Sequence, residues 1–114
     1  MTQHDDLTYL THILDMTESI RRMTLGVAKE TLESDETKLF AVLHALQIIG
    51  EASRQLAPET RNQLPEVPWS QIIGMRHRIV HDYFGIDFEV VWSALRSDVD
   101  PLARAVRNYL SDRS

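Results

Sequence analysis

Cysteine is absent from the sequence. Its absence excludes a disulfide scaffold, a zinc site built on thiolates and a cysteine nucleophile, and it fits a reducing compartment. The first ten residues, MTQHDDLTYL, lack both the basic start and the apolar run of a signal peptide. No stretch approaches the roughly 18 apolar residues of a membrane span. We therefore expect a soluble, cytoplasmic protein that has no membrane partner.

Lysine is scarce, since it occurs only at Lys29 and Lys38, and the other ten of the twelve basic residues are arginine. The planar fork of arginine suits bidentate contacts with phosphate. The net charge of −5 does not attract nucleic acid to the molecule as a whole, and the codon bias of a GC-rich genome would also enrich arginine. Composition therefore leaves nucleic-acid binding open.

Strand patterns are missing as well, because no run of residues alternates between apolar and polar. Apolar residues recur instead at steps of three and four. We expect helices over residues 6–24, 34–56, 69–83 and 88–109, with one further turn at 59–64. The length of 114 residues, with 43% hydrophobic and 25% charged residues, suggests one globular domain, residues 1–114. The sequence therefore predicts an all-α, antiparallel bundle of four or five helices.

Four residues indicate where these helices begin or end. Ser34 and Asp87 are N-cap candidates, because their side chains can accept a hydrogen bond from an N–H of the first turn. Gly85 is a C-cap candidate. Pro101 is expected to kink the last helix or to split it in two, because proline lacks an N–H and its ring clashes with the preceding turn.

Residues 76–83, RHRIVHDY, concentrate ionisable groups at the end of an apolar helix. Arg78 and Asp82 are spaced i, i+4, which is the spacing of a weak surface ion pair. His77 and His81 have the same spacing and would share one helical face, as in a two-histidine metal site, although the HExxH signature is absent. A surface ion pair and a metal site are thus two alternatives for this segment.

Arg76 and His81 suit a third kind of chemistry, the cleavage of a phosphodiester. A histidine with a pKa near neutrality can move protons from a 2′-hydroxyl and to a 5′-oxygen. An arginine can hold the phosphate and stabilise the charge that develops on it. The two residues are five apart, about 140° around an ideal helix. They can converge if the helix loosens near His81 or if a second copy supplies one of them.

Residues 72–84, IIGMRHRIVHDYF, contain a motif that resembles the R-x4-H-x-Y signature of HepT-like toxins, which belong to the HEPN superfamily of small helical ribonucleases. Further segments that resemble this family are LQIIGEA at 46–52, Trp69, VVW at 90–92 and DPL at 100–102. The similarity covers nearly the whole chain and is weakest before residue 35 and over 59–67.

The resemblance implies a role for each matching residue. Arg76 and His81 would be the catalytic pair of a metal-independent RNA endonuclease without a cofactor. His77 and Arg78 would position the substrate. Tyr83 would be the residue to which the cognate antitoxin, a minimal nucleotidyltransferase, attaches AMP.

The family acts as a homodimer in which two motifs line one cleft, so the resemblance also implies a second copy as a partner. Glu51 is a candidate to face the same cleft, with a solvent-facing helix position as the alternative, and Gly50 is expected to permit close helix packing. RNA binding by an acidic chain requires a local basic cleft, for which Arg21, Arg22 and Arg54 are further candidates. The alternative function is a non-catalytic helical partner that scaffolds or regulates a nucleotidyltransferase.

Overall fold

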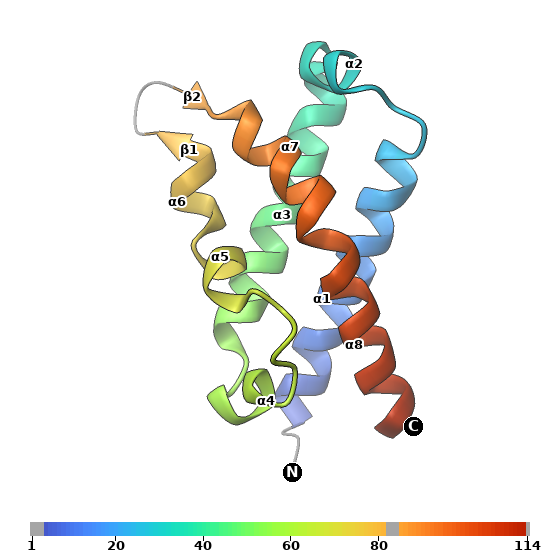
Figure 1. Cartoon of the computed structure of the whole chain (residues 1–114), viewed down its shortest axis with the longest axis vertical. Helices are drawn as coiled ribbons and strands as arrows, with labels where there is room; N and C mark the ends of the chain where they lie inside the picture. Colours follow the sequence, from blue (N-terminus) through green and yellow to red (C-terminus); the bar gives the residue numbers. More distant parts are fainter. Residues whose placement is uncertain (1–3, 82–84, 114) are drawn as a thin grey trace.

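The computed structural model describes residues 4–81 and 85–113 (Figure 1). In this part of the chain eight helices and one short hairpin follow one another. They are α1 (His4–Thr24), α2 (Lys29–Ser34), α3 (Glu36–Gln55), α4 (Pro58–Asn62), α5 (Trp69–Ile73), α6 (Met75–Ile79), β1 (Val80–His81), β2 (Gly85–Ile86), α7 (Phe88–Ser97) and α8 (Val99–Arg113). None of the helices in these residues is both long and apolar enough to cross a membrane.

Four longer helices, α1, α3, α7 and α8, make up the bundle, and the prediction of an all-α fold is confirmed. In Figure 1, α1 runs opposite to both α3 and α8. Helix α1 packs against α3 and α8, and α3 also packs against the short helices α5 and α6. The molecule is elongated, with extents of 44 × 30 × 20 Å.

The core is built from the apolar residues whose helical spacing predicted it. Residues buried in the structure include Leu10, Ile13 and Ile20 of α1, Val42, Leu43, Leu46 and Ile49 of α3, and Phe88, Val91, Val99, Leu102, Val106 and Tyr109 of α7 and α8. Burial of this apolar surface drives the helices together. The hydrophobic spacing therefore located the buried faces of the long helices correctly.

The ends of the helices differ in part from the predictions. Ser34 is the last residue of α2 rather than an N-cap, and the next residue, Asp35, caps α3 by accepting a hydrogen bond from the backbone N–H of Lys38 at 3.0 Å. The prediction for Asp87 is confirmed, because its carboxylate accepts a hydrogen bond from the N–H of Val90 at the start of α7.

The last helix is split, but not at Pro101. Helix α7 ends at Ser97 and α8 begins at Val99, which makes Pro101 the third residue of α8. A proline is tolerated in the first turn because its missing N–H would have no partner within the helix. The break therefore precedes the proline, which begins a helix rather than interrupting one.

The prediction of one continuous helix over 69–83 is wrong. Helix α5 ends at Ile73 with Gly74 as its C-cap, and α6 ends at Ile79. Strand β1 then pairs with β2 in antiparallel register, Val80 with Ile86 and His81 with Gly85. In a continued helix the carbonyl of Ile79 would accept from the residue four positions ahead. It accepts instead from the N–H of Asp87 at 2.7 Å, so long-range pairing replaces the next helical turn.

The backbone conformation of Gly85 belongs to the same hairpin. Its φ of +88° lies in the region that glycine adopts without steric cost. The residue opens β2 and is not a helix C-cap, so that prediction is wrong although the positive φ it required is present.

Two features fix the position of α5, one toward the preceding turn and one toward α3. The indole N–H of Trp69 lies within hydrogen-bonding distance of the carbonyls of Arg61 and Leu64, at 3.1 Å each, which anchors the start of α5 to the preceding turn. A Cβ placed on Gly50 would lie 3.1 Å from the carbonyl oxygen of Ile72. The expectation that Gly50 permits close helix packing is therefore confirmed.

Asp6 joins the start of α1 to the turn after α3. Its side chain is almost fully buried, at 3% exposure, and its carboxylate accepts hydrogen bonds from the N–H of Ala57, at 3.2 Å, and from the Thr60 hydroxyl. Ala57 precedes α4 and has no capping side chain of its own. Asp6 thus ties the start of α4 to α1.

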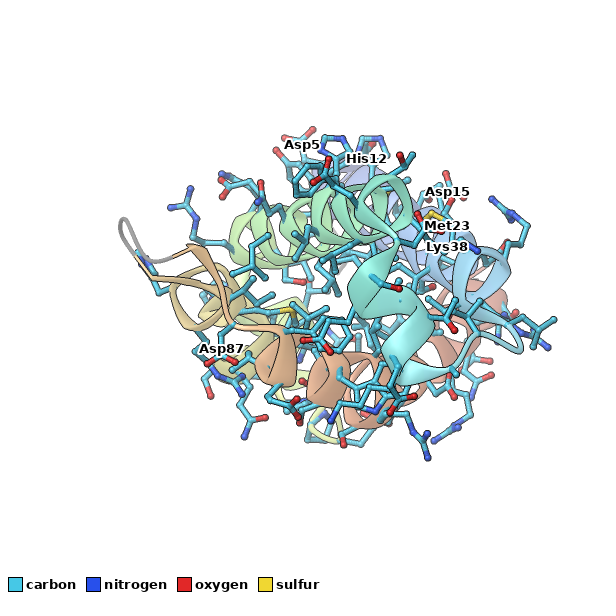
Figure 2. All side chains as sticks on the ribbon, turned by 90° about the horizontal axis from the view of Figure 1, so that it is seen from above. Asp5, His12, Asp15, Met23, Lys38 and Asp87 are labelled. Carbon is cyan, nitrogen blue, oxygen red and sulfur yellow. The ribbon has the colours of Figure 1, made fainter. Side chains whose placement is uncertain are left out.

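Replacing Asp6 by alanine is expected to lower the free energy of unfolding by about 1–3 kcal/mol, because it leaves the buried Thr60 hydroxyl and the partly buried N–H of Ala57 without their acceptor. Thermal and urea unfolding measure this loss, which corresponds to a melting temperature several degrees lower. Asp5→Ala is the matched control, since Asp5 belongs to the same first turn but is exposed and points outward (Figure 2). Equal destabilisation by the two variants would contradict the capping role.

Candidate active site

A pocket of about 230 Å³ lies between α3 and the α5–α6 segment. Its apolar wall is formed by Leu46, Gly50 and Ile73. Its polar groups come from His77 on α6 and from α3, whose contributors are Gln47, Glu51 and Arg54. The pocket is smaller than the roughly 300–1,000 Å³ of sites for drug-sized ligands, so it has room for a group of a few atoms such as one planar ring.

The polar residues of α3 follow one helical face. Gln47, Glu51 and Arg54 are separated by four and three residues, so they lie one above the other. Arg54 Nη2 donates to Glu51 Oε2 at 2.5 Å, and this hydrogen bond, together with the carboxylate charge, raises the pKa of the guanidinium. Both side chains remain well exposed, at 60% and 58%. The pair is therefore accessible to a ligand in the pocket.

His77, Glu51 and Arg54 line the same pocket. Gln47 was missed in the sequence, although its four-residue spacing from Glu51 would have identified it. Arg21 and Arg22 do not line this pocket, because they lie near the end of α1 beside α8 and line other hollows.

The catalytic candidates Arg76 and His81 lie before and after the pocket residue His77 in the sequence. The backbone of Arg76 belongs to α6 and that of His81 to β1, so one turn of helix and the start of a strand separate them. The side chains of Arg76 and His81 lie outside the described part of the structure, as do Asp82, Tyr83 and Phe84 entirely. Arg76 directly precedes the pocket residue His77.

The end of the helix at Ile79 changes two expectations. The separation of 140° between Arg76 and His81 does not apply, because the chain leaves the helix before His81. The expectation that His77 and His81 share one helical face is wrong for the same reason. Among the described residues no three His, Asp or Glu side chains gather as a metal site requires.

Arg78 does not line the pocket. Asp98, buried where α7 meets α8, has its carboxyl pKa raised by burial, and the positive charge of Arg78 opposes that rise. Successive helix residues are about 100° apart, so His77 and Arg78 present their side chains in different directions. The charge of Arg78 thus acts at the α7–α8 junction, while His77 faces α3.

The apolar residues near the motif differ in exposure. Ile79 is 3% exposed and belongs to the core of the single chain, and Trp92 is partly buried against that core. Among the described residues near this segment, Ile86 of β2 is an exposed apolar side chain, at 36%.

Comparison with known proteins gives one family match over most of the chain. The model of a family described as "Ribonuclease HepT-like" matches residues 13–109, which include the whole segment 76–83. No solved structure gives a significant match.

Three relatives are similar over most of their length. A protein of Caldanaerobacter subterraneus subsp. tengcongensis named "Putative RNase" is 33% identical over 102 residues, 90% of this chain and 91% of that protein. Another "Putative RNase", from Methanocaldococcus jannaschii, is 32% identical over 106 residues, 93% and 97% of the two chains. A "Probable ribonuclease HepT" of Thermococcus cleftensis is 36% identical over 94 residues, 82% and 86% of the two chains. The chain belongs to the HepT-like ribonuclease family.

Proposed function

We propose that this chain is a metal-independent RNA endonuclease and the toxin of a toxin–antitoxin pair. The observation that carries the proposal is the family match across segment 76–83, together with the pocket that His77 shares with Glu51 and Arg54 beside that segment. Arg76 and His81 are the proposed catalytic residues. His77 is the proposed substrate-positioning residue, with Glu51 in the cleft. Arg78 is left out of this proposal because it does not line the pocket.

The proposed reaction needs only an acid–base group and a cation. The imidazole of His81 takes the proton from the 2′-hydroxyl, whose oxygen bonds to phosphorus while the bond from phosphorus to the 5′-oxygen breaks. The 5′-oxygen receives a proton from a protonated imidazole, and the products carry a 2′,3′-cyclic phosphate and a 5′-hydroxyl. The guanidinium of Arg76 stabilises the charge that builds on the phosphate oxygens.

The pocket supplies a place for the nucleotide next to the scissile phosphate. Proteins that recognise RNA commonly bind the unstacked bases of single strands. An apolar wall at Gly50 and Ile73 suits the face of a base, while Gln47, Glu51 and Arg54 offer hydrogen-bond donors and acceptors to its edge. His77 would orient the nucleotide relative to Arg76.

A homodimer is part of the proposal, because a second copy would bring a second acid–base histidine to the same cleft. Two-fold pairing buries the same patch on both copies. Ile86, exposed beside the hairpin, and Phe40, 55% exposed on α3, are apolar residues available to such an interface.

The antitoxin is proposed to be a minimal nucleotidyltransferase that modifies Tyr83. In this step the phenolic oxygen bonds to the α-phosphorus of ATP, and pyrophosphate leaves. Only one residue separates Tyr83 from His81 in the sequence, so the added phosphate would bring negative charge to the catalytic segment and oppose the binding of RNA.

Digestion of RNA by the purified protein tests the proposed reaction. We expect cleavage to survive an excess of EDTA and to leave 2′,3′-cyclic phosphate and 5′-hydroxyl ends, because the acid–base group and the cation both belong to the protein. Enzymatic end-labelling and mass spectrometry of the fragments identify the ends. Activity that EDTA removes, or 3′-hydroxyl ends, would contradict this mechanism.

A further inference from the structure

Arginines gather on a second surface, where the end of α1 packs beside α8. Two adjoining hollows of this surface, of about 240 and 480 Å³, share Glu18, Arg21 and Arg107. Arg104 completes the first hollow and Arg22 the second. All four arginines are exposed. In Figures 1 and 2 the β1–β2 hairpin lies on one side of the molecule, and α1 and α8 lie toward the other.

This surface is basic although the protein is acidic. Four arginines face two carboxylates, Glu18 and Asp100, in the hollows, whereas the whole chain carries a net charge of −5. The ion pairs found among the described residues are Lys29–Glu89 and Arg54–Glu51, so none of the four arginines takes part in one. Like charges held close together repel unless an anion lies among them.

Helix stability accounts for only part of the cluster. Arg21 and Arg22 lie in the last turn of α1, where a positive charge interacts favourably with the helix dipole. Arg104 and Arg107 are in the interior of α8, where the dipole offers no such benefit. They are three residues apart and therefore lie on the same face of the helix, next to Arg21.

We propose that the surface formed by Arg21, Arg22, Arg104 and Arg107 binds the phosphate backbone of RNA, at a distance from the catalytic segment. The guanidinium fork matches phosphate oxygens in pairs. Two hollows in a row suit the repeated phosphates of a strand better than one small anion. The choice of RNA over another polyanion rests on the proposed ribonuclease function. The surface would hold one part of a long RNA while another part of the same RNA enters the cleft.

Binding of a fluorescent, fully 2′-O-methylated RNA to the wild-type protein tests this surface without any cleavage, because the attacking hydroxyl is blocked. The Arg104→Gln/Arg107→Gln variant is expected to bind about tenfold more weakly at low salt. The slope of log K against log salt is expected to fall by about 1.4, since each phosphate contact to a single strand contributes about 0.7. Glu18→Gln, which removes a negative charge from both hollows, is expected to tighten binding.

The matched control removes two positive charges elsewhere, in Lys38→Gln/Arg96→Gln, and is expected to leave the slope unchanged. An unchanged slope in the Arg104/Arg107 variant, an equal loss in the control, or no RNA binding by the wild type would each overturn the proposal. A changed oligomeric mass of the Arg104/Arg107 variant with unchanged RNA binding would assign the surface to a protein interface instead. Cleavage of unmodified RNA is assayed separately, so wild-type binding without cleavage would count against the proposed function alone.

Discussion

Replacing His81 by alanine is expected to lower the rate of RNA cleavage by about 10²–10⁴-fold, the usual contribution of a general acid–base group. In the proposed mechanism the imidazole of His81, from one copy or from both, carries out the proton transfers, and the variant removes it from both copies. Arg76→Ala is expected to lower the rate by a factor of about 10²–10³, as for loss of one group that stabilises transition-state charge. Single-turnover cleavage by the purified variants measures both losses, and toxicity on expression in cells should disappear in parallel.

The matched controls are His12→Ala and Arg96→Ala, because His12 is exposed on α1 (Figure 2) and Arg96 is exposed on α7. Both controls should cleave at the wild-type rate, and all four variants should keep the wild-type helical circular dichroism. Full activity of His81→Ala would remove the catalytic assignment.

Light scattering at micromolar concentration is expected to give a dimer mass. A monomer mass in a fully active preparation would contradict a site shared between two copies.

Replacing Tyr83 by phenylalanine is expected to leave an active ribonuclease that its antitoxin no longer silences by modification. The phenyl ring keeps the shape of the side chain but lacks the oxygen to which AMP would be attached. Because adenylylation adds a negative phosphate near Arg76 in the sequence, the modified wild-type protein is expected to be inactive, with its RNA affinity reduced. Intact-mass spectrometry after co-expression with a candidate nucleotidyltransferase antitoxin measures the added nucleotide.

Tyr9→Phe is the control for this experiment, since Tyr9 lies on α1, far along the chain from the motif. It should still be modified and silenced. Cleavage by Tyr83→Phe in the presence of the antitoxin is assayed after separation of the two proteins, which distinguishes modification from simple occlusion. A wild-type protein that is fully neutralised yet carries no added nucleotide on the Tyr83 peptide would rule out regulation by adenylylation of Tyr83.

The sequence by itself determined the buried faces of the long helices. Residues such as Leu10, Val42 and Val106 recur at helical spacing, and burial of apolar side chains dominates the free energy of packing. The Asp87 cap was also predictable, because it depends only on a carboxylate three residues before a free N–H. The residues of the motif and their resemblance to HepT-like toxins led to the family that the comparisons confirm.

Only the tertiary structure decided where the helix of the motif ends. Ile79 and Val80 continue the apolar pattern, so local sequence does not distinguish another helical turn from a strand. Two contacts make the distinction. The N–H of Asp87, eight residues further on, donates a hydrogen bond to the carbonyl of Ile79, and β1 pairs with β2. The same is true of the pocket and of the arginine surface. His77 and Glu51 line one pocket because Gly50 lets α3 and α5 approach closely. Arg21 and Arg107 line one hollow because the apolar faces of α1 and α8 pack together and bring two helices that are distant in sequence side by side.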